Sequence, residues 1–321
     1  MREFAFARAA TVDDAVAAPD GAMFLAGGTT LVDLMKLGVL RPRVVMDINA
    51  LPLREITLDE AGLTVGAGAR MSDLATHPDA VRAFPLVVQA LLAGASQQIR
   101  NMASIGGNLM QRTRCGYYRD PGSACNRRDP GGGCAALDGA NRTHAVLGTS
   151  PSCVATHPGD LAVALTALDA TVRIAGRGGE RDLPLAAFYR VPGGTPHIEN
   201  ALGPGELITA VHVPFADGHS AYVKVRDRAS YEFALASAAV LLRVREGVIA
   251  AARVAVGGVA TVPWRLPAVE AALTGLPATP GGFDGAAARA AEGARALAHN
   301  GYKIPLLRNT VLRAVEEALA R

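Results

Sequence analysis

MFLAGGTTLVDLMKLG, residues 23–38, predicts a strand, a tight glycine turn and a helix in direct succession. Thr29 or Thr30 is a suitable N-cap for that helix. Its apolar side chains recur with a roughly helical period, at Leu31, Leu34, Met35 and Leu37. The run VVMDI at 44–48 predicts a buried strand. We therefore expect residues 22–48 to form a small β-α-β unit.

Further elements are expected on both sides of a second glycine turn, SIGGNL at 104–109. Residues 63–68 predict a strand, and the Ala- and Leu-rich residues 84–97 predict a helix that leads into this turn. Residues 160–174 predict a helix that runs into a strand, and residues 206–213 predict another strand.

The composition of the chain changes after Pro214. Three strands with short connections, at 220–227, 234–243 and 248–257, predict an antiparallel sheet. Three Ala-rich helical stretches follow, near 266–275, 284–298 and 308–320. At 321 residues the chain is long enough for two domains. We expect a boundary near 216, with domains at 1–216 and 217–321.

The glycine turn AGGTT at 26–30 has the outline of a phosphate site. Glycine lets the backbone approach a ligand closely, and the free N–H groups at the start of a helix attract an anion. The turn is neither a GxGxxG fingerprint nor a GxxxxGK[ST] loop. Together with SIGGNL it could hold the two phosphates of one dinucleotide. The alternative is that both are ordinary tight turns.

All four cysteines fall in one segment, as Cys115, Cys125, Cys134 and Cys153. The surrounding residues 110–157 lack periodic pattern, and an unstructured loop of this length needs something to organise it. The spacing lacks the short knuckles of structural zinc sites. An iron–sulfur cluster, zinc, disulfides and free thiols all remain open on spacing alone.

Six arginines lie close to these cysteines, against the single carboxylate of Asp120; they are Arg100, Arg112, Arg114, Arg119, Arg127 and Arg128. They could form a solvated basic face, contact nucleic acid, or offset the charge of a group bound by the cysteines. Nucleic-acid binding is the weaker alternative because only Tyr117 and Tyr118 offer aromatic stacking nearby.

The chain carries no sign of a membrane span, because its longest apolar runs are far shorter than a bilayer requires. Its first residues include acidic side chains and no apolar core, unlike a secretory signal. We therefore expect a cytoplasmic protein, or a periplasmic one if a partner subunit with its own signal exports the complex.

Four ordered motifs resemble the flavin-binding subunit of the molybdenum hydroxylases, the xanthine dehydrogenase and carbon monoxide dehydrogenase family. They are AGGTTLVDLMK (26–36), RNMASIGGNL (100–109), HPGDLAVAL (157–165) and YVKVRDRASY (222–231). The resemblance covers nearly the whole chain. It implies an α+β fold: a two-lobed FAD-binding domain, with a small β-α-β lobe and a mainly antiparallel lobe, is followed by a C-terminal domain with a three-stranded antiparallel sheet and a three-helix bundle.

The resemblance also implies which residues bind FAD. The pyrophosphate would lie between two segments, Leu25, Ala26, Gly27, Gly28, Thr29, Thr30, Leu31 and Ser104, Ile105, Gly106, Gly107, Asn108. Asp160 matches an acidic residue that hydrogen-bonds toward the ribityl or flavin portion. Leu207 matches a residue that packs near the flavin ring, and Lys224 matches a lysine near the flavin edge. Without the resemblance, Asp160 would be a helix N-cap and Lys224 a solvated charge.

The segment from QRTRC (111–115) to CVATHP (153–158) is similar to the aldehyde oxidoreductase subfamily, whose flavin subunit carries an additional [4Fe-4S] cluster. The resemblance implies that Cys115, Cys125, Cys134 and Cys153 are its ligands. It implies no catalytic residue for the organic substrate in this chain.

The resemblance further implies an electron-transfer subunit of a heterotrimer. A large partner would hold the molybdenum cofactor and oxidise an aldehyde or N-heterocycle. A small partner would carry [2Fe-2S] clusters and pass electrons to FAD, and FAD would pass them to an external acceptor. Two alternatives are a self-contained flavin oxidase and a zinc-stabilised nucleic-acid-binding module. Residues 22–33 contain no histidine for the covalent flavin attachment that many such oxidases use.

Overall fold

The computed structural model describes all 321 residues and contains the predicted β-α-β unit at the N-terminal end of the chain. Three parallel strands form a small sheet in the order β1-β3-β2. The unit consists of β1 (Ala5–Arg8), α1 (Val12–Val16), β2 (Met23–Leu25), α2 (Leu31–Lys36) and β3 (Val44–Asp47). Gly38 ends α2 with a φ of 71°, a conformation that glycine adopts without strain.

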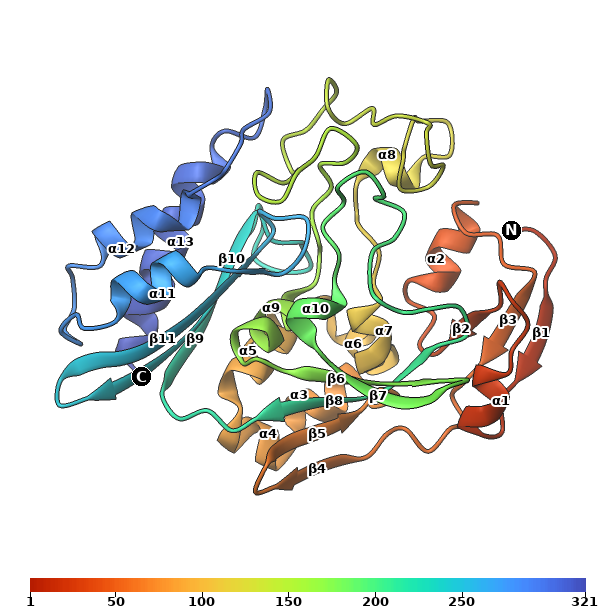
Figure 1. The fold of residues 1–321 in the computed structure, drawn as a ribbon, viewed down its shortest axis with the longest axis horizontal. Coiled ribbons are helices and arrows are strands. Elements are labelled where there is room, and N and C mark those ends of the chain that lie inside the picture. Colours follow the sequence, from red (N-terminus) through yellow and green to blue (C-terminus); the bar gives the residue numbers. More distant parts are fainter.

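A five-stranded antiparallel sheet follows, in the order β4-β5-β8-β6-β7. Its strands are β4 (Ile56–Asp59), β5 (Gly62–Gly66), β6 (Thr171–Gly176), β7 (Gly179–Pro184) and β8 (Leu207–Pro214). Alternate residues of these strands, such as Leu63 and Val65, are buried in the larger hydrophobic core. Figure 1 shows the helices α3 to α7 beside this sheet.

Those helices are short and closely spaced: α3 (Met71–Thr76), α4 (Pro78–Ala83), α5 (Pro85–Ala93), α6 (Gln97–Met102) and α7 (Ile105–Leu109), with α9 (Asp160–Ala167) and α10 (Leu185–Phe188) later in the chain. The predicted helix at 84–97 is thus wrong in its extent. It ends at Ala93 because Gly94 is extended and Ala95 has a positive φ of 55°. Every residue of α9 is buried, so this helix is the centre of the larger core.

The cysteine segment, 110–157, contains only one short helix, α8 (Gly116–Arg119), as its lack of pattern predicted. Figure 1 shows it as a set of loops near α8, between the N-terminal unit and the C-terminal elements. Leu34 of α2 packs against Tyr118 and Cys125, which ties the segment to the N-terminal unit.

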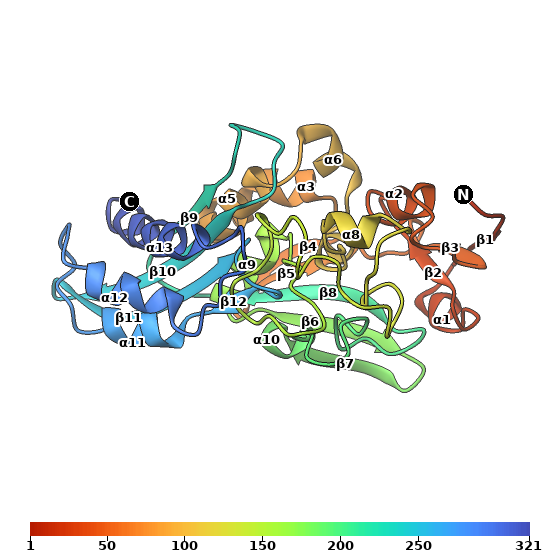
Figure 2. The ribbon, with the colours of Figure 1, turned by 90° about the horizontal axis from the view of Figure 1, so that it is seen from above.

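The C-terminal part is an antiparallel sheet covered by helices, with a second hydrophobic core of its own. Its elements are β9 (His219–Val225), β10 (Ala236–Arg245), β11 (Val248–Gly257), β12 (Trp264–Arg265), α11 (Pro267–Leu273), α12 (Asp284–Ala288), the 3-10 helix η1 (Arg289–Ala291) and α13 (Lys303–Leu319). The expected three strands are present, and the two-residue β12 adds a fourth. Figure 2 shows the helices α11 to α13 gathered at one end of the molecule.

The second predicted helix of this part, 284–298, is too long. It stops at Ala291, shortly before Gly293, whose φ of 75° does not continue a right-handed helix.

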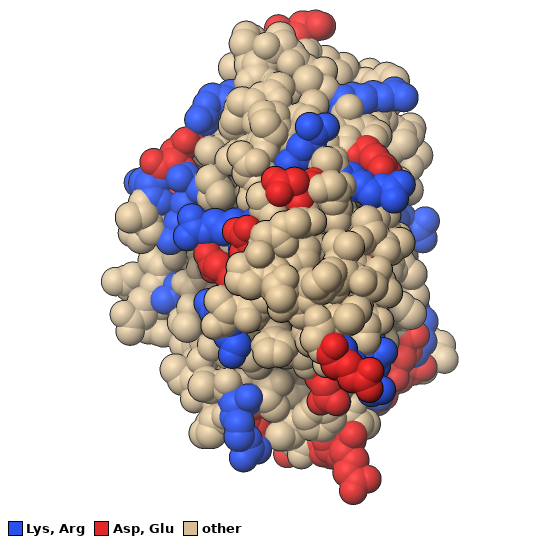
Figure 3. All heavy atoms as spheres, turned by 90° about the vertical axis from the view of Figure 1, so that its left-hand side faces the viewer, with Lys and Arg blue, Asp and Glu red and all other residues tan.

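The outer face of this end carries basic and acidic side chains interspersed around a broad uncharged area (Figure 3). No helix of the protein is both apolar enough and long enough to cross a bilayer.

Candidate functional site: a glycine-lined cavity and the adjoining cysteine loop

The two glycine turns lie against each other and form one wall of a cavity of about 570 Å³. Gly27 leaves no room for a side chain, because an added Cβ would overlap the carbonyl of Met102, just before the second turn. Gly106 approaches Ala67 in the same way. The predicted residues that line the cavity are Ala26, Gly27, Gly28, Thr29, Thr30, Leu31, Ser104, Gly106, Gly107 and Leu207. Leu25 lies in β2, and Ile105 is buried in the core.

The two turns differ in the backbone donors that they offer to a ligand. In the first turn, the N–H groups from Gly27 to Thr30 donate to no acceptor within the protein. In the second turn, the N–H groups of Ile105 and Gly106 donate to the carbonyls of Ala69 and Ala67, and Ser104 Oγ accepts from Gly107 N–H at 3.1 Å. The first turn therefore presents four free backbone donors to an anion, and the second presents one, the N–H of Ser104. That the two turns hold two phosphates stays a prediction.

Asp160 is the centre of a buried polar group that joins the two parts of the chain. Its carboxylate accepts a hydrogen bond from Tyr222 Oη at 2.7 Å and one from Lys224 Nζ at 2.8 Å. Both side chains come from β9, whereas Asp160 is in the first turn of α9. Burial, and then the Asp160 charge, raise the pKa of Tyr222 well above its ordinary value.

This arrangement corrects two readings made from residue types alone. The N-cap of α9 is Gly159, and the Asp160 side chain makes no cap hydrogen bond. Lys224 is not solvated, because its side chain is only 4% exposed and Nζ also donates to the carbonyl of Ala93. Sequence reasoning overlooked Tyr222, although its position two residues before Lys224 on one strand places both on the same face.

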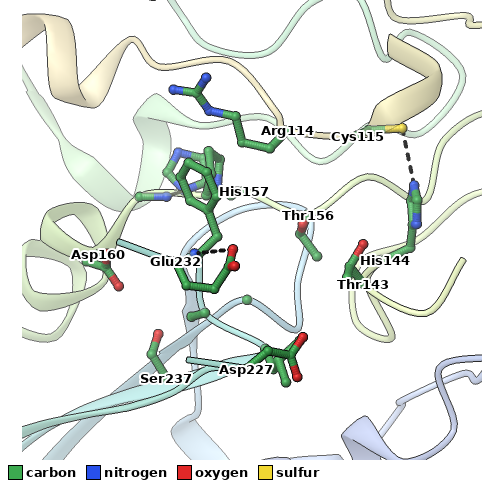
Figure 4. Close-up of a pocket in the computed structure, with 16 residues that line it drawn as sticks. Arg114, Cys115, Thr143, His144, Thr156, His157, Asp160, Asp227, Glu232 and Ser237 are labelled. Carbon is green, nitrogen blue, oxygen red and sulfur yellow. Dashed lines mark hydrogen bonds between the residues drawn. The ribbon is translucent and has the colours of Figure 1, made fainter. Parts of the chain in front are cut away.

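A second cavity adjoins the glycine-lined one, and a third adjoins the second. The second, of about 500 Å³, shares Thr29, Thr30 and Gly107 with the glycine-lined cavity and extends along Asn108 to Asp160. The third, of about 280 Å³, runs from Asp160 to Cys115. Figure 4 shows this third cavity, with Asp160 and Ser237 on one side and Cys115 and His144 on the other. Leu207 and Asp160 line different cavities.

The four cysteines are all reduced, and all four line one small cavity of about 10 Å³. No disulfide is formed. No three His, Cys, Asp or Glu side chains are placed to hold a single metal ion. Ligation of a cluster by Cys115, Cys125, Cys134 and Cys153 stays a prediction. The cavity is also lined by Tyr117, Tyr118 and Arg127.

Several contacts are directed at the sulfur atoms. His144 Nε2 lies 3.2 Å from Cys115 Sγ, as the dashed line in Figure 4 marks. Arg127 Nη2 donates to Cys153 Sγ at 3.7 Å. Burial raises the pKa of Cys115 to about 11, so this thiol keeps its proton at neutral pH in the absence of a metal.

The arginines near the cysteines do not form a solvated basic face, because each has a partner within the protein. Arg114 and Arg119 bind Asp33, and Arg112 and Arg127 bind Glu199. The other two donate to backbone carbonyls: Arg100 to Gly94, and Arg128 to Tyr117 and Tyr118. Of the six, Arg127 hydrogen-bonds a cysteine sulfur. Glu199 itself lies in a Pro- and Gly-rich stretch whose sequence gives no sign of this role.

A cavity between two close glycine turns, with free backbone donors on its wall, is suited to a phosphate-bearing ligand such as a dinucleotide. Residues 2–216 match the family described as FAD binding domain in molybdopterin dehydrogenase. Residues 220–318 match the CO dehydrogenase flavoprotein C-terminal domain. The chain therefore belongs to the FAD-binding subunits of the molybdenum hydroxylases, and it is an oxidoreductase component.

Similar proteins include subunits of several such enzymes. The chain is 46% identical over 328 residues to the aldehyde oxidoreductase FAD-binding subunit PaoB of Escherichia coli (strain K12), covering 100% of both chains. It is 28% identical over 277 residues to the glyceraldehyde dehydrogenase medium chain of Sulfolobus acidocaldarius, covering 85% of this chain and 82% of the relative. The solved reconstituted CO dehydrogenase from Oligotropha carboxidovorans shares the fold, with a TM-score of 0.78 at 23% identity over 100% of this chain and 99% of that one.

Proposed function

We propose that this chain is the FAD-bearing electron-transfer subunit of an aldehyde-oxidising molybdenum hydroxylase. The free N–H groups of Gly27 to Thr30, in a cavity that a second glycine turn closes, carry this proposal. A diphosphate is the ligand that such donors suit best. The 46% identity to an aldehyde oxidoreductase subunit over the full chain supports an aldehyde as the substrate of the complex.

FAD supplies the ability to accept and release two electrons when it is bound. In our proposal its pyrophosphate lies against Gly27 to Thr30, and Asn108 and Asp160 line the adjoining space that extends away from the turns. Tyr222 and Lys224 hold the Asp160 carboxylate in position. Leu207 packs against the ligand from the opposite wall of the glycine-lined cavity. The residues of the chain thus bind and orient FAD, and none acts on the organic substrate.

The complex would divide the reaction among subunits. A large subunit with the molybdenum cofactor would oxidise the aldehyde, and a small [2Fe-2S] subunit would deliver the electrons to this chain. An external acceptor would then reoxidise the flavin. This division agrees with the relatives, several of which are named as medium chains or subunits.

We also propose that the four cysteines bind a [4Fe-4S] cluster. All four cysteines line one cavity, and Arg127 Nη2 already donates to one of them, at Cys153 Sγ. Four thiolates are the ligand set of such a cluster. The names of the relatives and families mention no cluster.

The purified chain tests both parts of the proposal. Ultraviolet–visible and EPR spectra, with metal and sulfide analysis, should report about one FAD and four iron atoms per chain. Protein prepared gently but lacking flavin would contradict the FAD proposal. Zinc without flavin would select the zinc-stabilised module instead. Cys125→Ser should lose iron and keep FAD; retention of full iron by this variant would exclude the cluster as assigned.

A further inference from the structure

A chain of charged side chains, buried or partly buried, connects the glycine-lined cavity with the cysteine cavity. Arg112 lines the first cavity and Arg127 lines the second. Both guanidinium groups bind the same carboxylate, that of Glu199: Arg112 Nη2 pairs with Oε1, and Arg127 Nη1 lies 2.7 Å from Oε2. Arg127 also donates to Cys153 Sγ through its other terminal nitrogen.

The three side chains are well shielded from water. Their exposed fractions are 24% for Arg112, 15% for Glu199 and 7% for Arg127. A second contact also joins the two cavities: the Arg112 guanidinium stacks over the ring of Tyr118, and Tyr118 lines the cysteine cavity. Contacts among these few residues therefore link a residue that lines the first cavity to residues that line the second.

The carboxylate of Glu199 is shared by two arginines. Two cations share a single anion here, which leaves one positive charge without an anionic partner in a position largely shielded from water. Arg112 faces the cavity proposed for the FAD pyrophosphate, and Arg127 faces the sulfur atoms proposed as cluster ligands. An anionic group in either cavity extends the alternation of positive and negative charge.

We infer that Glu199 is a positioning residue for both cofactors at once. It holds Arg112 at the wall of the FAD cavity and holds Arg127 against Cys153. This inference rests on the proposed function, and it adds a link between two sites that would otherwise be independent. Because hydrogen bonds to cluster sulfur atoms raise the reduction potential, the position of Arg127 also sets the potential of the cluster.

Three variants of the full chain test this inference: R112Q, R127Q and E199Q. The affinity for FAD is measured by adding FAD to deflavinated protein, and the midpoint potential of the cluster is measured by EPR-monitored redox titration. R112Q should weaken FAD binding about tenfold and leave the potential unchanged. R127Q should lower the potential and leave FAD binding unchanged. E199Q should weaken FAD binding about tenfold and also lower the potential.

The sign of the potential change in E199Q separates positioning from other roles. Loss of the Arg127 contact with Cys153 lowers the potential. Simple removal of a nearby negative charge would raise it, and a purely structural role would leave it unchanged. Either of these two results overturns the inference. Glu317→Gln, which breaks an exposed ion pair with Arg313 on α13, is the matched control and should behave like the wild type.

The outcomes also separate this inference from the proposed function. Wild-type protein without iron overturns the cluster proposal together with the cluster half of the inference. Wild-type protein that contains FAD and iron, with an E199Q variant identical to it in affinity and potential, overturns the inference alone.

Discussion

At the scale of single residues, the buried pair of Asp160 and Lys224 is the most consequential interaction between the two parts of the chain. The Lys224 ammonium has one anionic partner, Asp160, and one carbonyl, that of Ala93. A buried pair of this kind is costly to break, because removal of one partner leaves the other charged and desolvated. The pair therefore links the packing of α9 against β9 to the electrostatics of the proposed flavin site.

Asp160→Asn should lower the free energy of unfolding by about 3–5 kcal/mol, because it leaves the Lys224 ammonium without an anionic partner. Tyr222→Phe removes only one hydrogen bond to the same carboxylate and should cost about 1–2 kcal/mol. Urea denaturation measures both values. Asp79→Asn, in an exposed ion pair with Arg82, is the control. Equal stability of the Asp160 and Asp79 variants would show that the buried pair contributes nothing.

The burial of Lys303 predicts that the free energy of unfolding depends on pH. It is fully buried, and Nζ donates to the carbonyls of Thr143 and Gly258. Burial, with Arg142 nearby, lowers its pKa from 10.5 to about 7, although Asp227 works in the opposite direction. Between about pH 7 and pH 10.5, Lys303 is mostly protonated in the unfolded chain and mostly neutral in the folded protein. The free energy of unfolding should therefore rise with pH across this window, by up to about 1.4 kcal/mol per pH unit. Below pH 7 the protein should carry the full cost of burying the charged Lys303 side chain.

Lys303→Met removes the titrating group and should flatten this rise. The measurement is the free energy of unfolding in urea at several pH values from 6.5 to 10, for the wild type and the variant. The difference between the two profiles isolates Lys303 from other groups that titrate there. Parallel profiles would contradict the prediction.

At the scale of elements, the first glycine turn depends on its contact with the second. Gly27→Ala would place a methyl group on the Met102 carbonyl and push the two turns apart. We expect this variant to fold but to lose most of its FAD, which the flavin absorbance per protein measures. Gly285→Ala, at a site in α12 with open space, is the control and should keep its flavin. An FAD-replete Gly27 variant would argue against this turn as the phosphate site.

Local patterns in the sequence predicted most elements, because strands and helices with one apolar face follow periods of 2 and 3.6. The helix beginning at Leu31 and the three long strands after residue 216 were found within a few residues of their true ends. The errors arise where glycine or a positive φ interrupts an Ala-rich run, as at Ala95 and Gly293. Whether the domain boundary lies at 216 stays a prediction, although the two hydrophobic cores are separate.

At the scale of the whole molecule, the candidate site was only partly predictable. The glycine turns are contiguous in sequence, so motif reasoning identified them. The partners of the arginines could not be found in this way, because Asp33 and Glu199 lie about 80 residues away in sequence from the side chains that they bind. The different donor patterns of the two turns could not be predicted either, because they depend on the carbonyls of Ala67 and Ala69 on a neighbouring segment.

The C-terminal part of the chain also holds the cysteine segment in place. Asn300, which is fully buried, donates from Nδ2 to the carbonyls of His144 and Ala145. The backbone N–H of His299 donates to Asn141 Oδ1. The loop that carries the four cysteines is therefore ordered by residues more than 150 positions further along the chain.

Asn300→Ala should loosen this loop, because it leaves two buried carbonyls without donors at a cost of about 1–3 kcal/mol each. We expect trypsin to cleave the Arg-rich residues 110–157 several-fold faster in the variant, while the glycine-lined cavity retains FAD. Limited proteolysis followed by mass spectrometry locates the cuts. Tyr302→Phe removes one hydrogen bond, to the carbonyl of Arg142 at the surface, and is the control. If both variants were cut at the wild-type rate, the loop would be ordered by its own contacts and not by the C-terminal part.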